Sequence, residues 1–142
     1  MKHIAIFGSG GGSNARSIIE YFRNDQTVKV ALIVSNRSEV GILEHAAEFE
    51  IPTKILDRDK FYNTDDLLSD LSEHKVDLIV LAGFLWLIPK YLIKAYPDQI
   101  VNIHPALLPK FGGKGMYGMN VHRAVKEARE QESGITIHTI DE

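Results

Sequence analysis

Asn102 and His104 are the residues whose types and spacing best suit chemistry in this sequence. They stand two positions apart at the end of residues 99–104, which read as a β-strand, and Pro105 follows them. Alternate residues of a strand point to the same face, so the amide and the imidazole are expected to reach one pocket. A neutral imidazole exchanges protons near neutral pH, and an amide N–H can stabilise an oxyanion. The pair suits acyl or formyl transfer to an amine, and a strand end with a surface His is the alternative interpretation.

A glycine-rich turn lies between the first predicted strand and the first predicted helix. Glycines let a ligand approach the backbone, and amides at a helix start bind anions. We therefore expect Gly12, Ser13 and Asn14 to form a phosphate site, with a flexible turn as the alternative. The turn reads Gly8-Ser9-Gly10-Gly11-Gly12-Ser13-Asn14.

The same turn also fits the glycine fingerprint of dinucleotide-binding proteins, through Gly10, Gly12 and Ala15. An NAD site would favour an acidic residue at the end of the second strand. The sequence instead has Asn36 and Arg37 near that point. This composition argues against NAD and leaves room for NADP, whose additional phosphate an Arg accommodates.

A hydrophobic segment follows the strand predicted at residues 77–82. It contains Leu85, Trp86, Leu87 and Ile88. Such a segment can wall a pocket for a flat aromatic ligand, because ligands of open α/β sheets bind beyond the carboxyl ends of the strands. Packing into the core is the simpler interpretation of these residues taken alone.

The sequence contains six His and no Cys. The His residues show none of the spacings typical of metal sites, so no metal is expected. His138 alternates with Thr136 and Ile140 along a predicted strand, which would bring it toward His104.

Hydrophobic runs alternate along the chain with segments of helical spacing. Strands are predicted at residues 2–7, 28–35, 52–56, 77–82, 99–104 and 135–140. Helices are predicted at residues 14–22, 41–49, 60–74, 89–96 and 120–130, with Asn63 or Thr64 as the cap of the third. This alternation is typical of an α/β fold of three layers, Rossmann-like, in which helices cover both faces of a mostly parallel sheet.

The bulk composition excludes several classes of function. With 142 residues the chain is expected to form a single domain, and 44% hydrophobic with 25% charged residues is ordinary for a globular protein. A net charge of −3 without Lys/Arg runs argues against nucleic acid as a partner. No signal peptide or membrane-length apolar run is visible, so we expect a cytoplasmic protein. Its partners are expected to be small molecules, and monomer and homodimer both stay open.

Together, these motifs resemble those of the folate-dependent formyltransferases, and most closely of the glycinamide ribonucleotide branch of purine synthesis. The resemblance covers the whole chain. It rests on Gly10-Gly11-Gly12-Ser13-Asn14, Leu81-Ala82-Gly83-Phe84, Asn102-Ile103-His104-Pro105-Ala106-Leu107-Leu108-Pro109 and Gly134-Ile135-Thr136-Ile137-His138.

The resemblance implies transfer of a formyl group from 10-formyltetrahydrofolate to the amine of glycinamide ribonucleotide. His104 then matches the catalytic His, and Asn102 matches the residue that contacts substrate and steadies the oxyanion. His138 matches a supporting residue of the substrate site. Gly12, Ser13 and Asn14 match the phosphate loop, and Leu85, Trp86, Leu87 and Ile88 match the folate segment.

The resemblance also implies an essential Asp after the strand that contains His138. We expect that Asp beyond Glu142, although Asp141 lies near the position, and we expect the 142 residues to be a domain truncated at its C-terminus with little turnover alone. Two alternatives stay open: a formyltetrahydrofolate hydrolase, and a noncatalytic Rossmann module that binds NADP or another nucleotide.

Overall fold

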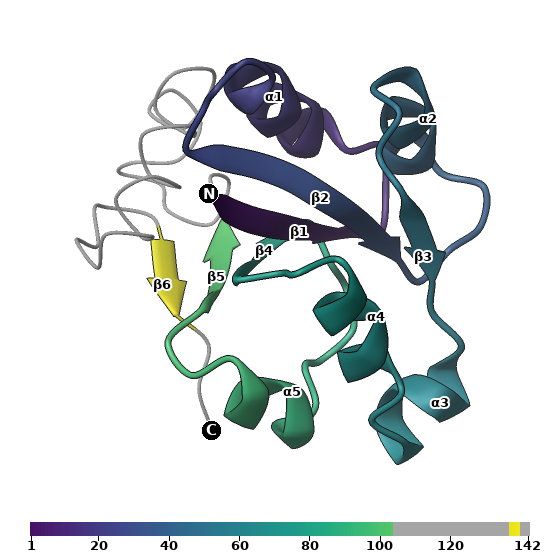
Figure 1. Ribbon diagram of the computed structural model, residues 1–142. Helices are drawn as coiled ribbons and strands as arrows, with labels where there is room; N and C mark the ends of the chain where they lie inside the picture. The colour runs from purple at the N-terminus through teal and green to yellow at the C-terminus, as the bar shows by residue number, and fades with distance from the viewer. Residues whose placement is uncertain (104–136, 140–142) are drawn as a thin grey trace.

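The computed structural model describes residues 1–103 and 137–139 and contains one six-stranded sheet between helices (Figure 1). The strand order is β3-β2-β1-β4-β5-β6, in which β1 to β5 are parallel and β6 is antiparallel to β5. The predicted mostly parallel α/β sheet is confirmed. The strands are β1 Lys2–Gly8, β2 Val28–Ser35, β3 Thr53–Ile55, β4 Leu78–Ala82, β5 Ile100–Ile103 and β6 Ile137–Thr139.

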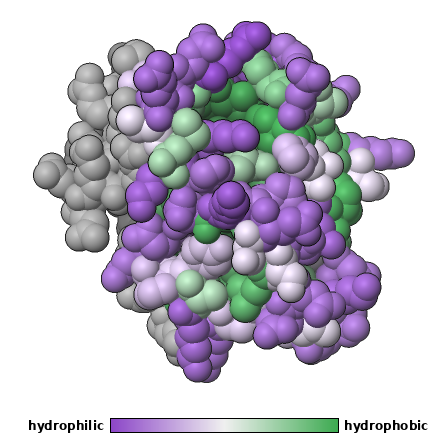
Figure 2. All heavy atoms as spheres, viewed as in Figure 1, coloured by the Kyte–Doolittle hydropathy of each residue, from purple (hydrophilic) through white to green (hydrophobic). Residues whose placement is uncertain are grey.

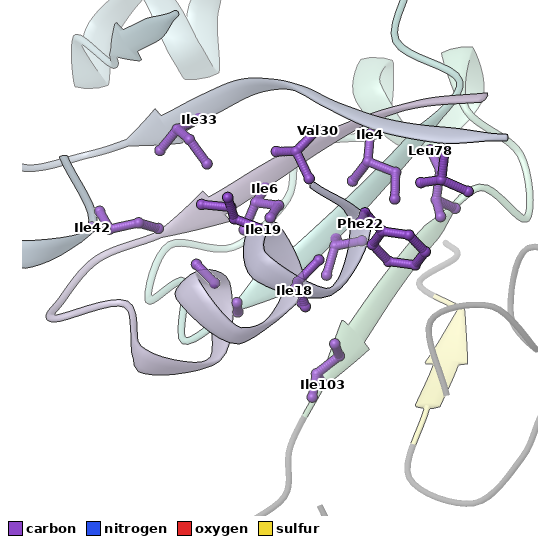
Figure 3. Close-up of a cluster of buried hydrophobic side chains, with 14 of the residues drawn as sticks. Ile4, Ile6, Ile18, Ile19, Phe22, Val30, Ile33, Ile42, Leu78 and Ile103 are labelled. Carbon is purple, nitrogen blue, oxygen red and sulfur yellow. The ribbon is translucent and has the colours of Figure 1, made fainter. Parts of the chain in front are cut away.

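Helices cover both faces of the sheet, as the alternating pattern predicts. Helices α1 (Ser13–Phe22) and α2 (Gly41–Glu48) pack on one face, where Ile18, Ile42 and neighbouring strand residues form a buried cluster (Figure 3). Helices α3 (Arg58–Asn63), α4 (Leu67–Glu73) and α5 (Lys90–Ala95) supply side chains to a second cluster on the other face. Burial on both faces explains why the parallel strands read as nearly continuous hydrophobic runs.

A bulge in β2 shows how the two clusters divide the strand residues. Ile4 pairs with Val30 and Ala5 pairs with Leu32, so Ala31 is the additional residue. The bulge shifts the alternation of β2, and Val30 and Ile33 consequently belong to the same cluster.

The single helix predicted at residues 60–74 is wrong, because the structure contains α3 and α4 with a break between them. Asp57 is the N-cap residue of α3, and its carboxylate accepts from the Lys60 amide at 3.0 Å. It ends where Thr64 turns extended and donates its hydroxyl to the Lys60 carbonyl at 2.7 Å. The predicted cap at Asn63 or Thr64 is also wrong, since these residues end α3 and Asp66 precedes α4. A Thr side chain that competes for backbone carbonyls favours such an interruption.

The other described helices differ from their predicted bounds by no more than one residue at either end. Helix α1 begins at Ser13 instead of Asn14, and α5 has Pro89 at its N-cap. The helix predicted at residues 120–130 lies outside the described residues. Of the strand predicted at 135–140, residues 137–139 are described and form β6.

The surface seen in the orientation of Figure 1 is mostly hydrophilic, and hydrophobic side chains show in the gap between α1 and α2 (Figure 2). Arg16 spans the two helices, because its guanidinium donates to both carboxylate oxygens of Glu48, at 2.6 and 3.0 Å. The same guanidinium lies 5.2 Å from the ring centre of Phe49. Among the described residues, no helix is long and apolar enough to span a membrane.

Tyr91 is expected to make the protein less stable in alkaline solution. Burial, with the nearby carboxylates of Asp65 and Asp66, raises the pKa of Tyr91 to about 12. The unfolded chain loses this proton near pH 10, so stability starts to fall there and the loss is complete above the folded pKa. Discounted for partial exposure, the loss is roughly 1–2 kcal/mol.

Urea unfolding at neutral pH, and at a pH above the pKa of Tyr91 in the unfolded chain, measures this loss of stability. Tyr91→Phe removes the ionisable group together with its 2.8 Å hydrogen bond to the Phe61 carbonyl. The variant should be slightly less stable at neutral pH but should lose less stability than the wild type on going to alkaline pH. Equal alkaline losses in the two proteins would show that Tyr91 has no part in them.

Candidate functional site

Several described residues of the predicted site lie at the carboxyl edge of the sheet, near its topological switch point. The strand order reverses between β1 and β4, because the chain runs outward from β1 to β2 and β3 before returning to β4. Open α/β sheets bind their ligands in the crevice beyond such a point. The glycine loop follows β1, the segment 85–88 follows β4, and Asn102 lies near the end of β5.

The glycine loop, residues 9–12, leads directly into α1. Gly12 is the N-cap residue of α1 and has a φ of 76°, in the left-handed region that favours glycine. No side chain of the described residues caps α1, and its first turn contains no acidic residue. The N–H groups of Ser13 and Asn14 therefore carry an uncompensated partial positive charge at the N-terminus of the helix. This arrangement suits an anion such as a phosphate.

Only some of these glycines are required by packing. A Cβ atom at Gly12 would lie 2.8 Å from Cβ of Ile42 and 2.9 Å from its Cα. Within the part of the chain that the structure describes, a Cβ atom at Gly10 or Gly11 would meet nothing within 4 Å. The Gly10 carbonyl accepts from the Ile42 amide at 3.1 Å, which holds the loop against the start of α2. The loop is thus held against the start of α2 at Gly10 and Gly12, and a ligand can approach Gly11 on the side where its Cβ atom would stand.

Asn102 belongs to a row of paired residues that crosses the sheet. Phe7 pairs with Leu81, Leu81 with Asn102, and Asn102 with His138. Asn102 is half-buried. Its neighbours Val101 and Ile103 belong to the cluster beneath α1 and α2, so alternation puts Asn102 on the face covered by α3, α4 and α5.

The predicted partners of Asn102 are described only in part. The register places His138 directly opposite Asn102 in the antiparallel pair of β5 and β6. His104 lies outside the described residues, so its predicted position beside Asn102 and its approach to His138 stay predictions.

The segment 85–88 divides its side chains between solvent and core. Leu85 and Leu87 are 75% and 83% exposed. Trp86 and Ile88 are partly buried against the cluster on the α3 side. Core packing is therefore confirmed for Trp86 and Ile88. Leu85 and Leu87 form an apolar surface, and its part in a ligand pocket stays a prediction.

Aromatic residues support the segment from beneath. The ring centre of Trp86 lies 5.7 Å from that of Phe61 and 6.0 Å from that of Tyr62. The Arg58 guanidinium lies 5.2 Å from the ring centre of Trp86. The Tyr62 hydroxyl donates to the Leu87 carbonyl at 2.8 Å. These contacts join the segment to α3 and restrict its position.

Sequence reasoning missed Ser9, which joins the loops after three strands. Its hydroxyl donates to Asn36 Oδ1 at 2.6 Å and accepts from the Leu85 amide at 2.9 Å. The signal in the sequence that could have pointed to Ser9 is a Ser among glycines at the end of a strand. Asn36, near the Arg37 considered for NADP, thus has its side-chain oxygen engaged with Ser9, while Arg37 is exposed.

A cleft among the described residues lies at the opposite edge of the sheet. It has a volume of about 880 Å³, and its lining includes His3, Phe22, Phe49 and His74, at the amino ends of strands and the carboxyl ends of helices. That is the edge away from the switch point, so we do not assign the chemistry to it. Among the described residues, no group of His, Asp or Glu is placed to hold a metal ion.

Comparison with known proteins identifies the class of site. Residues 2–142 match the family model described as formyl transferase. The chain is 45% identical over 148 residues to the chloroplastic phosphoribosylglycinamide formyltransferase of Arabidopsis thaliana, with 99% of this chain and 50% of that protein covered. It is 35% identical over 147 residues to the phosphoribosylglycinamide formyltransferase of Bacillus subtilis, with 100% and 73% covered. The chain thus spans about half the length of the plant relatives it matches.

Solved structures agree with this comparison. The crystal structure of glycinamide ribonucleotide transformylase 1 from Geobacillus kaustophilus matches with a TM-score of 0.72 and 34% identity, covering 100% of this chain and 76% of that chain. That of phosphoribosylglycinamide formyltransferase from Bacillus halodurans matches with a TM-score of 0.71 and 36% identity, covering 99% and 73%. These matches do not favour the hydrolase or the noncatalytic nucleotide-binding module.

Proposed function

We propose that this chain, which belongs to the formyl transferase family, transfers a formyl group from 10-formyltetrahydrofolate to the amine of glycinamide ribonucleotide. The observation that carries the proposal is the meeting of three features at one edge of the sheet: the open glycine loop, the half-buried Asn102 and the apolar segment 85–88. The names of the relatives support the same reaction.

Two of the three features each suit one substrate, and the third lies where the two substrates would react. The uncapped start of α1 suits the phosphate of the ribonucleotide, through the amides of Gly12, Ser13 and Asn14. The exposed Leu85 and Leu87 side chains, beside Trp86 and Ile88, suit the apolar ring system of the folate co-substrate. Asn102 lies on the same face as that segment, at the end of β5, where the formyl group would meet the amine.

The chemistry follows from this placement. The amine nitrogen attacks the formyl carbon and forms a tetrahedral intermediate whose oxygen carries negative charge. The Asn102 amide donates a hydrogen bond to that oxyanion, and a donor in place before the reaction needs no reorganisation. His104 receives the proton of the attacking amine, and the folate nitrogen gains a proton as its bond to the formyl carbon breaks. We expect His138, opposite Asn102 in the sheet, to support this site.

A formyl-transfer assay tests the proposal. The chain is incubated with 10-formyltetrahydrofolate and glycinamide ribonucleotide, and formylated ribonucleotide is measured together with free formate. Formylated product that depends on both substrates supports the proposal. Formate release that does not depend on the ribonucleotide would instead indicate a hydrolase.

The phosphate loop gives a sharper test through Gly11, where an added Cβ atom would meet nothing within 4 Å among the described residues. Gly11→Asp is expected to raise KM for the ribonucleotide about tenfold, because a carboxylate beside the helix start repels the phosphate. KM for the formyl folate should change little. Gly11→Asn is the matched control, since it has nearly the same shape without the charge and should stay within about twofold of the wild type. Equal effects of Asp and Asn would mean that size, and not phosphate binding, explains the change.

A further inference from the structure

Ser9 is one of two buried polar residues in the described part of the chain, with 2% of its surface exposed. Its hydroxyl is a donor to Asn36 Oδ1 and an acceptor for the Leu85 amide. A hydroxyl has a single hydrogen, so donation to Asn36 leaves its lone pairs available for Leu85. The Asn36 carbonyl oxygen therefore orients the Ser9 hydroxyl for its bond to Leu85.

The backbone after β4 is anchored at alternate residues. The Gly83 carbonyl accepts from the Ser9 amide at 3.2 Å, the Leu85 amide donates to Ser9 Oγ, and the Leu87 carbonyl accepts from Tyr62. Ser9 provides both anchors at the β4 end of the segment. Gly83, the first anchored residue, has a φ of 74° and turns the chain there.

Two of these anchored residues have exposed side chains. Leu85 and Leu87 point away from the core while their backbone is held. A hydrogen bond to the Leu85 amide therefore decides where an apolar surface lies relative to the glycine loop, since Ser9 immediately precedes Gly10.

We propose that Ser9 is a positioning residue for binding of the folate co-substrate. Its hydroxyl holds Leu85, and with it the segment 85–88, at a fixed place beside the glycine loop. This inference rests on the proposed formyl transfer. Ser9 touches neither substrate in this scheme and acts through the Leu85 backbone, with Asn36 orienting its hydroxyl.

Hydrogen exchange of the Leu85 amide tests the anchor itself, independently of activity. In the wild type the amide donates to Ser9 Oγ in a partly buried hydrogen bond. Ser9→Ala should speed its exchange about tenfold or more, because the amide loses its acceptor. Tyr62→Phe, which removes the bond to Leu87, should leave Leu85 protected. Unchanged exchange in Ser9→Ala would overturn the anchoring role.

Steady-state kinetics tests the consequence for substrates. Ser9→Ala should raise KM for 10-formyltetrahydrofolate about fivefold to tenfold, the effect of losing one buried hydrogen bond. KM for the ribonucleotide should stay within about twofold, with a smaller change in kcat. Asn36→Ala should reproduce part of the effect, whereas Asn36→Asp keeps the acceptor oxygen and should restore nearly normal KM.

Tyr96→Phe is the matched control for general loss of stability. It removes one side-chain hydrogen bond to a distant backbone carbonyl, that of Val76 at 3.1 Å. It should leave both KM values unchanged. Equal KM increases for both substrates in Ser9→Ala, or the same pattern in Tyr96→Phe, would overturn the inference while formyl transfer stands. A folded protein that contains these residues in a chain as long as its relatives, and that shows no formyl transfer, would count against the proposed function and with it against this role of Ser9.

Discussion

Replacing Asn102 by Ala is expected to lower kcat for formyl transfer by about 10²–10³, the cost of removing one oxyanion donor. KM for either substrate should change much less, because the hydrogen bond forms fully only in the transition state. The half-buried position of Asn102 at the end of β5 motivates the prediction. Stopped assays at saturating concentrations of both substrates measure kcat, and urea unfolding verifies that the variant is folded.

Asn102→Asp is the matched control, because it keeps the size of the side chain and removes its N–H donor. We expect Asp to be at least as harmful as Ala, since a carboxylate repels the developing oxyanion. His104→Ala should also lower kcat severely in a folded protein, and the double variant should be little worse than either single one if the two residues act on one step. Near-normal kcat in a folded Asn102→Ala or His104→Ala protein would contradict these catalytic roles.

Gly12→Ala is expected to reduce the free energy of unfolding by about 2–4 kcal/mol. About 1–2 kcal/mol comes from placing a side chain in the left-handed region, and a similar amount from the forced displacement of Ile42. The φ of 76° and the 2.9 Å approach to a backbone atom of Ile42 support both contributions. Urea unfolding measures the change.

Gly11→Ala is the control for this experiment, because its Cβ atom meets no described residue within 4 Å and its φ lies outside the left-handed range. It should be within about 0.5 kcal/mol of the wild type. Equal destabilisation by the two substitutions would mean that the loop does not pack against α2 as described. A substitution at Gly12 is therefore a poor test of phosphate binding, because it also destabilises the fold. A substitution at Gly11 is expected to change binding without that loss of stability.

The fold could be predicted well where a local pattern sufficed. The hydrophobic run of β4 is buried at all five of its residues, Leu78 to Ala82, and its length and composition already indicated a covered strand. The glycine loop was expected at the start of α1 and is there. The family expected from the motifs is confirmed by the family model over residues 2–142.

Local patterns failed where a distant or competing contact decided the outcome. The helical spacing of residues 60–74 gave no sign that the Thr64 hydroxyl would bind the Lys60 carbonyl and end α3. For the segment 85–88 core packing was the simpler interpretation, and the inward packing of alternate residues became visible only once α3 lay beneath Trp86.

The sequence by itself determined the α/β alternation, the family and the candidate residues at the strand ends, because hydrophobic spacing and short motifs act between near neighbours. The tertiary structure alone decided that His138 pairs with Asn102, that Ile42 makes Gly12 obligatory, and that Ser9 joins residues 27 and 76 positions away. Such contacts depend on strand order and register, which bring distant parts of the chain together, and no local pattern encodes the atoms that will meet there.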